Sequence, residues 1–259
     1  MLTFIIAFSQ AKRQLYGAID IITMKPLYLL TILLLSCQIS LAQTTAADFA
    51  TEGICKSNSR DYYGAIQDFN KAISIDSTNA KYYNQRGIAY FNLFYFKEAI
   101  RDFGKAIQLQ PENFEAYFNR GLVRGMIGDY YGAIRDFDKT IQYNPTFADA
   151  YNSRGIAKGN VGLYTEAIPD FDKVIELRPD VADYYLNRGI ALEKMGKNKS
   201  AIMDFDKAIQ LKPTLGEAYF NRGLAKDRIG DFSGACMDWS TAGELEEYGA
   251  YDLIKLYCK

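Results

Sequence analysis

Small and aromatic residues recur along this chain every 34 residues, and this interval sets the length of one repeating unit. Each unit has glycine at its eighth position, alanine at its twentieth and an aromatic ring at its twenty-fourth. The glycines are Gly53, Gly87, Gly121, Gly155, Gly189 and Gly223, and the rings are Phe69, Phe103, Phe137, Phe171, Phe205 and Trp239. Six units follow one another without gaps, at 46-79, 80-113, 114-147, 148-181, 182-215 and 216-249. Such self-similarity is typical of a repeat array.

The pattern inside a unit predicts two antiparallel helices. Apolar or small residues at positions 4, 8 and 10, and again at 20, 21, 24, 27 and 28, follow the helical period. The two apolar stripes must face each other, with glycine at 8 and alanine at 20 allowing close approach. Gly128, Gly162, Gly196 and Gly230 are expected in the turns, and Pro111, Pro145, Pro179 and Pro213 are expected to end the second helices. Pro169 lies inside a predicted second helix; with Thr165 as N-cap it falls at the end of the first turn, where its cost is small.

The motif Tyr-x2-Arg-Gly…Ala-x3-Phe…Pro at this spacing resembles the tetratricopeptide repeat (TPR), whose signature has leucine where this chain has arginine. The resemblance covers residues 46 to 249. It implies an all-α solenoid of six helix-turn-helix units that form a right-handed superhelix with a concave groove. The last ten residues, 250-259, are expected to form a C-terminal capping helix. The resemblance also implies a non-enzymatic protein that binds a partner protein or peptide in its groove.

An arginine at position 7 and an aspartate at position 23 recur in phase. Every unit has the aspartate, and every unit except the first has the arginine, where Glu52 stands instead. Pairing within a unit would oppose Glu52 to Asp68, so we predict pairing between units, from Asp68–Arg86 to Asp204–Arg222. The alternative is that the arginines bind an anionic ligand; the matching carboxylates favour structural pairs.

In proteins of this family, positions 5, 9 and 13 of the first helices usually face the groove. The resemblance therefore implies a partner-binding groove with apolar centre and polar edge, formed by Asn84, Ile88, Phe118, Leu122, Met126, Asn152, Ile156, Asn160, Leu186, Ile190, Lys194, Phe220, Leu224 and Arg228. Position 2 adds an acidic rim of Glu115, Asp149, Asp183 and Glu217. We expect a peptide with apolar anchors and some positive charge. The alternative is that the aliphatic residues at position 9 only pack the first helices together.

Composition limits the kinds of ligand and of catalysis that we expect. The chain has a formal net charge of -1 and no histidine. A basic nucleic-acid surface is therefore not expected, and neither are histidine-dependent catalysis nor a histidine metal site. We predict no catalytic residues, no cofactor, no metal and no small-molecule substrate. Cys55 is predicted to be buried, whereas Cys236 and Cys258 lie on elements that should touch and are expected either as a disulfide or as free thiols.

The first 42 residues resemble a targeting segment. From Met24, a better start than Met1, one lysine precedes an apolar run from Leu27 to Leu35, which is shorter than the roughly 20 residues of a spanning helix. Small residues then lead to predicted cleavage after Ala42. Leu34 to Cys37 alternatively resembles a bacterial lipobox, with lipid attachment at Cys37. We therefore expect an exported protein, periplasmic or secreted, or else an outer-membrane lipoprotein that takes part in envelope assembly; an enzyme is the least favoured alternative, because no interior unit breaks the repeat.

Overall fold

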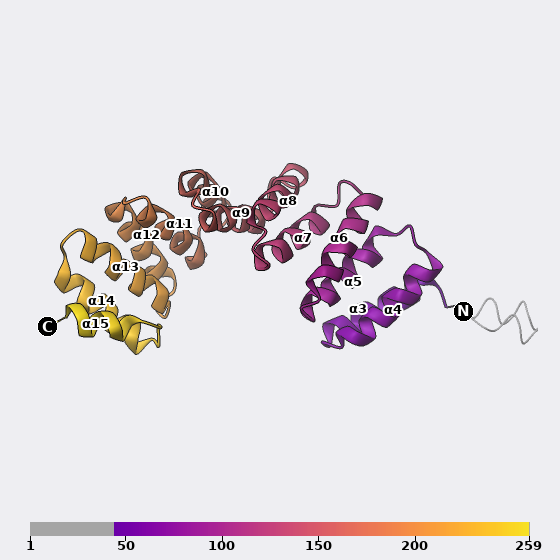
Figure 1. Cartoon of the computed structure of the whole chain (residues 1–259), viewed down its shortest axis with the longest axis horizontal. Coiled ribbons are helices and arrows are strands. Elements are labelled where there is room, and N and C mark those ends of the chain that lie inside the picture. Colours follow the sequence, from indigo (N-terminus) through magenta and orange to yellow (C-terminus); the bar gives the residue numbers. More distant parts are fainter. Residues whose placement is uncertain (1–43, 259) are drawn as a thin grey trace, which may run out of the picture. The chain divides into compact units, whose positions relative to one another are not determined.

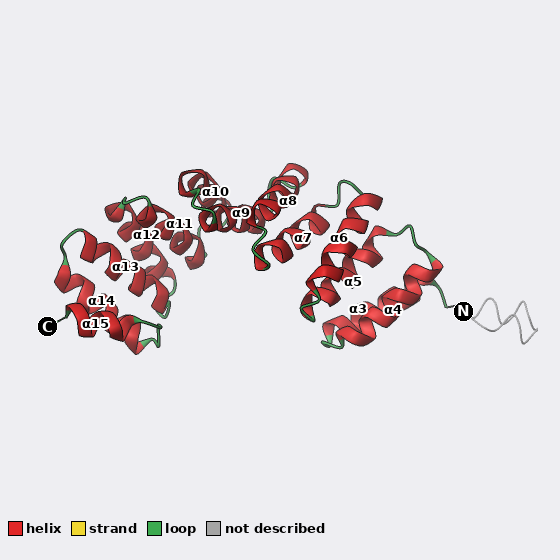
Figure 2. Cartoon of the chain, viewed as in Figure 1, coloured by secondary structure: helices red, strands yellow, loops and turns green. Residues whose placement is uncertain are grey.

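The computed structural model describes residues 44–258, and this part of the chain contains helices and loops but no strand (Figure 1 and Figure 2). The helices are α3 (Ala46–Asn58), α4 (Tyr62–Ile75), α5 (Ala80–Asn92), α6 (Phe96–Leu109), α7 (Phe114–Met126), α8 (Tyr130–Tyr143), α9 (Ala148–Asn160), α10 (Tyr164–Leu177), α11 (Ala182–Lys194), α12 (Asn198–Leu211), α13 (Gly216–Arg228), α14 (Phe232–Glu244) and α15 (Ala250–Tyr257). The predicted all-α solenoid of six helix pairs followed by a C-terminal helix is confirmed.

Neighbours in sequence are neighbours in space throughout the stack. Each helix packs on the helix before it and the helix after it, so the second helix of one pair touches the first helix of the next. The first helices of consecutive pairs (α3, α5, α7, α9, α11 and α13) also touch one another, whereas their second helices make no comparable contact in the described part of the chain. The first helices therefore lie on the inner side of the stack.

The close packing inside each pair depends on a glycine beneath a ring. A Cβ on Gly87 would lie 2.7 Å from Cε1 of Phe103, and one on Gly155 would lie 2.7 Å from Cε1 of Phe171. The rings at position 24 are buried, and each buried ring contributes roughly 1.5–3 kcal/mol to stability. The predicted roles of glycine at position 8 and the ring at position 24 are thus confirmed.

The turns and helix starts show one departure from the prediction. Gly128, Gly162, Gly196 and Gly230 have φ between 74° and 86°, a left-handed conformation that glycine adopts without steric cost. The helix α10 begins after Leu163, so Thr165 is not its N-cap and that prediction is wrong. Pro169 consequently lies beyond the first turn. Its side chain is exposed, so the ring itself does not disturb the core.

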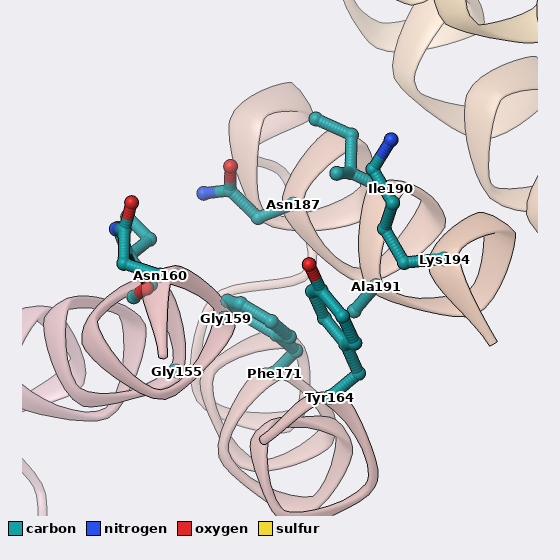
Figure 3. Close-up of a pocket in the computed structure, with 10 residues that line it drawn as sticks. Gly155, Gly159, Asn160, Tyr164, Phe171, Asn187, Ile190, Ala191 and Lys194 are labelled. Atoms are coloured by element: carbon teal, nitrogen blue, oxygen red, sulfur yellow. Dashed lines mark hydrogen bonds between the residues drawn. The ribbon is translucent and has the colours of Figure 1, made fainter. Parts of the chain in front are cut away.

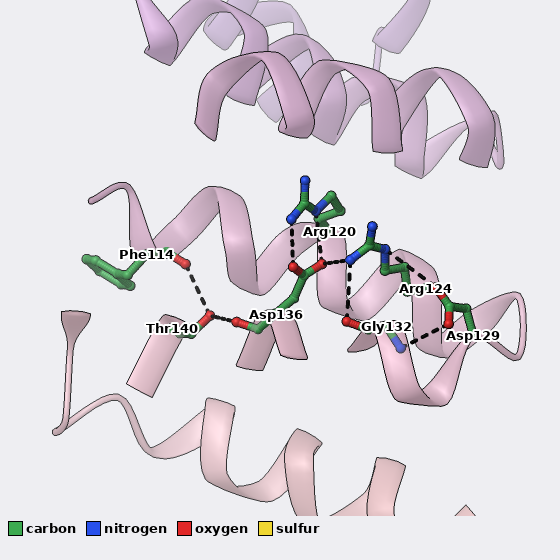
Figure 4. A network of polar contacts seen from close by, with 7 residues as sticks. All are labelled: Phe114, Arg120, Arg124, Asp129, Gly132, Asp136 and Thr140. Carbon is green, nitrogen blue, oxygen red and sulfur yellow. Dashed lines mark hydrogen bonds and ion pairs between the residues drawn. The ribbon is translucent and has the colours of Figure 1, made fainter. Parts of the chain in front are cut away.

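The arginine at position 7 pairs within its own unit, so the predicted ladder between units is wrong. Arg120 donates from Nε and Nη2 to the carboxylate of Asp136, at 2.9 and 2.7 Å (Figure 4). The same two-pronged contact joins Arg86–Asp102, Arg154–Asp170, Arg188–Asp204 and Arg222–Asp238. The geometric reason is that α7 and α8 run antiparallel, which brings positions 7 and 23 of one unit face to face.

In the first unit, which lacks the arginine, lysines pair with the aspartate at position 23 instead. Lys56, one helical turn beyond Glu52, donates to Asp68, and Lys71 lies 3.3 Å from the other carboxylate oxygen. Burial disfavours the charged form of Asp68, but the hydrogen bonds from the two lysines outweigh it and lower the pKa of Asp68. Glu52 is therefore no evidence for pairing between units.

A second contact of the arginines does cross between units, and it uses position 25. Arg154 Nη1 donates to Asp138 of the preceding unit at 2.6 Å. The corresponding contacts are Arg86–Asn70, Arg188–Asp172 and Arg222–Asp206. These four arginines thus link neighbouring units, and the predicted structural role is supported over anion binding.

The last helix is fixed to the end of the stack. The helix α15 packs on α14, with Tyr257 beside Trp239 at 5.9 Å between ring centroids. A disulfide joins Cys236 to Cys258, so of the two states left open by the sequence the structure has the bonded one. Cys55 is exposed, contrary to prediction. The equivalent residues in later units, such as Ala89, are buried; Cys55 belongs to the first unit, and no preceding unit covers it within the described residues.

The predicted targeting segment, with Met24, Cys37 and the cleavage point after Ala42, lies outside the described residues. Within residues 44–258, no helix is both long and apolar enough to cross a membrane.

Candidate binding groove

The predicted groove residues all lie on the first helices, but they differ in how far they are open to solvent. Asn84 and Leu186 are buried. Half-buried positions are Ile88, Phe118, Leu122, Asn152, Ile190, Phe220 and Leu224, and exposed ones are Met126, Ile156, Asn160, Lys194 and Arg228. The inner face of the stack is therefore partly core and partly accessible surface.

Several of the aliphatic residues help to hold the stack together. Ile88 packs against the cluster that contains Phe103 and Val123. Leu122 packs against the cluster formed by Phe137 of its own unit and Ala157 of the next unit. Leu186 belongs to the core around Phe205. For these positions the structure shows the packing role that the sequence left as an alternative; a binding role for them stays a prediction.

Four predicted residues come together in one hollow between α9 and α11. Ile156 and Asn160 lie on one side of it and Ile190 and Lys194 on the other, around a space of about 250 Å³. Figure 3 shows Tyr164 and Phe171 rising from α10 between the two first helices. An apolar hollow with a few polar groups at its rim is the usual form of a ligand site.

Six of the ten residues that line this hollow were not predicted from the sequence. The additional residues are Gly155, Gly159, Tyr164, Phe171, Asn187 and Ala191. A signal was present: the fourth unit has glycine at position 12 as well as at position 8, and both glycines line the hollow.

A second hollow, of about 610 Å³, lies at the amino-terminal end of the stack. Asn84 lines it together with Ile54 and Lys81, and the loop before α7 closes it with Gln110, Glu112 and Asn113. Asn84 is the only one of the predicted groove residues that lines it. More of its lining residues have polar or charged side chains than those of the hollow between α9 and α11.

The asparagines form pairs across neighbouring first helices. Asn187 Nδ2 donates to Asn152 Oδ1 at 3.0 Å, and Asn119 Nδ2 donates to Asn84 Oδ1 at 3.3 Å. Each pair joins position 5 of one unit to position 6 of the next. Both pairs border a hollow, through Asn187 in one case and Asn84 in the other.

Charge is distributed unequally along the first helices. At their carboxyl ends, the buried carboxylate of Glu193 pairs with Arg228 and lies 3.4 Å from Lys194, so these two groove cations are partly neutralised. At the amino ends, burial together with the charges of Glu247 and Asp183 raises the pKa of Glu217. The acidic rim therefore lacks a compensating cation at this point, and it favours a positively charged ligand.

Family models identify the repeats. Four models described as tetratricopeptide repeat or TPR repeat match residues 61–93, 80–113, 148–181 and 182–215. Residues 61–113 and 148–215 therefore consist of tetratricopeptide repeats. A search of curated proteins finds no significant match.

Solved structures share the fold. The crystal structure of MamA protein is 27% identical, covers 66% of this chain and 93% of its own, and superposes with a TM-score of 0.62. YrrB, described as a TPR protein with an unusual peptide-binding site, is 20% identical over 72% of this chain and 97% of its own, with a TM-score of 0.64. A repeat protein from Parabacteroides merdae ATCC 43184 is 24% identical over 85% and 86%, with a TM-score of 0.59. The last two likenesses concern the fold alone.

Within residues 44–258, no three or more His, Cys, Asp or Glu side chains gather in a way that would hold a metal ion. The buried carboxylates at position 23 are each engaged by a cation of their own unit.

Proposed function

We propose that this TPR protein is a non-enzymatic scaffold that holds an extended, positively charged segment of a partner protein on the inner face of its first helices. The observation that carries the proposal is the hollow in which Ile156, Asn160, Ile190 and Lys194 meet. It combines apolar walls with amide groups, and these are the features by which grooves recognise peptides. Packing of the first helices against one another would not require such an open space.

The charge of the proposed partner segment follows from which charged side chains at the two ends of the first helices are already paired. Asp183, Glu217 and Glu247 form no ion pair in the described part of the chain, whereas Lys194 and Arg228 already have Glu193. A basic segment therefore gains more than an acidic one. A free terminal carboxylate is disfavoured as the recognised group, since the cations that would bind it are paired.

The cellular place of the scaffold is proposed from its first 42 residues. A cleaved targeting segment would put the repeats in the periplasm or outside the cell, within an envelope complex. Lipid attachment at Cys37 is the alternative, supported by the sequence Leu34 to Cys37. Mass spectrometry of the mature amino terminus distinguishes the two, because one form begins at Gln43 and the other at an acylated Cys37.

Site-specific photo-crosslinking tests the binding function. Benzoylphenylalanine replaces Met126 or Ile156 on the inner face, which are 57% and 40% exposed. The matched controls are Met203 and Met237 on the second helices, which are even more exposed. We expect the same partner to be captured from cells at both inner positions and not at the controls. Equal capture at all four positions, or none at the inner ones, would contradict the proposal.

A further inference from the structure

Two glycines in the middle of the inner face have no packing reason to be glycine. At position 12, where other units have serine, phenylalanine, glutamate or aspartate, the third and fourth units have Gly125 and Gly159. A Cβ on Gly125 would meet nothing within 4 Å, and one on Gly159 would meet only Tyr164 Cε1 at 4.0 Å. Glycine inside a helix costs about 0.5–1 kcal/mol relative to alanine. The fold alone therefore does not explain these residues.

Gly155, one turn earlier in α9, provides the contrast. A side chain there would collide with Phe171. In every other unit, a side chain at position 8 would likewise collide with the ring at position 24 of that unit. Gly159 has no such neighbour, yet it borders the hollow between α9 and α11. What its missing side chain provides is open space.

The size of the hollow suits one large side chain. Its volume is about 250 Å³, whereas an apolar protein cavity of about 150 Å³ is sufficient to hold benzene. Ile156, Ile190 and Phe171 give it apolar walls. The hydroxyl group of Tyr164 and the amide of Asn187 lie at its edge (Figure 3).

The asparagine pair beside the hollow has hydrogen-bonding groups to spare. The bond from Asn187 Nδ2 to Asn152 Oδ1 leaves Asn152 Nδ2 as a donor and Asn187 Oδ1 as an acceptor. Neither atom is engaged by another group within residues 44–258, and neither is a buried unsatisfied atom. A donor next to an acceptor complements the C=O and N–H groups of an extended main chain.

We infer that the hollow between α9 and α11 is a socket for one aromatic or large aliphatic side chain of an extended peptide, whose main-chain amide binds the Asn152–Asn187 pair. The inference rests on the groove-binding function proposed above and specifies its central subsite. Asn84 and Asn119 repeat the amide pair two units earlier, so that the same peptide can be held at a second point along its main chain.

Small probes test the socket without knowledge of the partner. The probes are N-acetyl-phenylalaninamide, N-acetyl-alaninamide and toluene, each added to purified protein while the methyl signals of Ile156 and Ile190 and the side-chain amide signals of Asn152 are followed by NMR. We expect N-acetyl-phenylalaninamide to shift both sets of signals and N-acetyl-alaninamide to shift neither. Toluene binding as tightly as the phenylalanine probe, with no effect on Asn152, would overturn the peptide assignment.

Matched variants locate the socket. Gly159→Leu fills the hollow and should weaken binding of N-acetyl-phenylalaninamide by about tenfold or more. Gly125→Leu places the same side chain at the same position of the preceding unit, outside the lining, and should leave binding unchanged. Asn152→Ala should weaken the binding of N-acetyl-phenylalaninamide but not the binding of toluene. Wild-type binding by Gly159→Leu, or an equal loss in both leucine variants, would overturn the inference.

The two failures are distinguishable. If Gly159→Leu has no effect on the probe while Met126 still crosslinks to a partner, the socket is wrong and the scaffold function stands. If neither Met126 nor Ile156 captures a partner, the function itself is contradicted.

Discussion

Arg188 donates two hydrogen bonds to Asp204, from Nε at 2.8 Å and Nη2 at 2.7 Å, and no second cation reaches that carboxylate in the described part of the chain. Asp170, one unit earlier, has two cations, Arg154 and Lys158. The difference arises at position 11, where the fourth unit has Lys158 and the fifth has Leu192. The two units thus offer a natural comparison of one ion pair with and without support.

Arg188→Met should destabilise the protein more than Arg154→Met. Removing Arg188 leaves the buried Asp204 without a partner, and we expect a loss of about 3 kcal/mol, at the lower end of the cost of breaking a buried pair. Asp170 keeps Lys158 at 2.7 Å, so its loss should be clearly smaller. Urea unfolding of both variants measures the difference, and equal losses would show that the lysine contributes nothing.

The unexplained glycines predict a gain in stability. Gly125→Ala and Gly159→Ala should each raise the free energy of unfolding by about 0.5–1 kcal/mol, because alanine is the better helix former and meets no obstacle. Gly155→Ala should lower it, because the new Cβ would press on Phe171. Thermal unfolding of the three variants checks the order. A loss of stability in Gly159→Ala would mean that the glycine has a structural role after all.

The acidic rim predicts a pH-dependent variant. Partial burial and the charges of the nearby Glu247 and Asp183 raise the pKa of Glu217 above its usual 4.5, so the folded state binds more protons than the unfolded state in the pH range between the two pKa values. The contribution of Glu217 to stability therefore falls as the pH rises through this range. Glu217→Gln should melt at a higher temperature than wild type at pH 7 and at the same temperature below pH 4.

Glu115→Gln is the control for the rim. Glu115 is at position 2 of the third unit, as Glu217 is at position 2 of the sixth. Unlike Glu217, it lines a hollow that a cation, Lys81, also lines. A similar gain at pH 7 in both variants would show that the effect does not depend on the charges around Glu217.

The disulfide predicts how the end of the stack opens. Cys236→Ser/Cys258→Ser removes a link across a sequence separation of 22 residues, and the last helix pair with α15 should lose about 2–4 kcal/mol of stability. Hydrogen exchange should become faster in α15 and α14 and remain unchanged in α3 to α8. A dithiol reductant should reproduce this effect in wild type and have none in the variant. Unchanged exchange in α15 would show that Tyr257 and its neighbours suffice to hold the helix.

The helix pairs were predictable because their determinants are local and repeated six times. A glycine sixteen residues before a ring, as in Gly87 and Phe103, has one geometric solution, in which the ring lies on the glycine across a tight hairpin. The Arg–Asp pairing was not predictable in the same way. Position 7 contacts position 23 of its own unit and position 25 of the preceding one, and spacing alone does not separate these two neighbours. The exception at Glu52 pointed to the wrong choice because Lys56 supplies the missing charge from one turn further on.

The candidate site was predictable in position but not in extent. Ile156, Asn160, Ile190 and Lys194 followed from the positions that face the groove in the family that the chain resembles, whereas Tyr164 and Phe171 enter the hollow from a second helix. Spacing along one helix cannot reveal residues contributed by another. Burial of Asn84 and Leu186 depends on neighbouring units, and it likewise has no signal in the sequence of a single unit.

The most direct test of the account measures binding of the partner segment that photo-crosslinking recovers. A synthetic peptide of that segment is titrated against wild type, Ile156→Asp and Met203→Asp, with its affinity followed by fluorescence anisotropy. Ile156 lines the hollow, whereas Met203, 72% exposed, lies on the second helix α12. We expect at least about tenfold weaker binding for Ile156→Asp and wild-type binding for Met203→Asp. Wild-type affinity in Ile156→Asp, or loss only in Met203→Asp, would contradict binding on the inner face of the first helices.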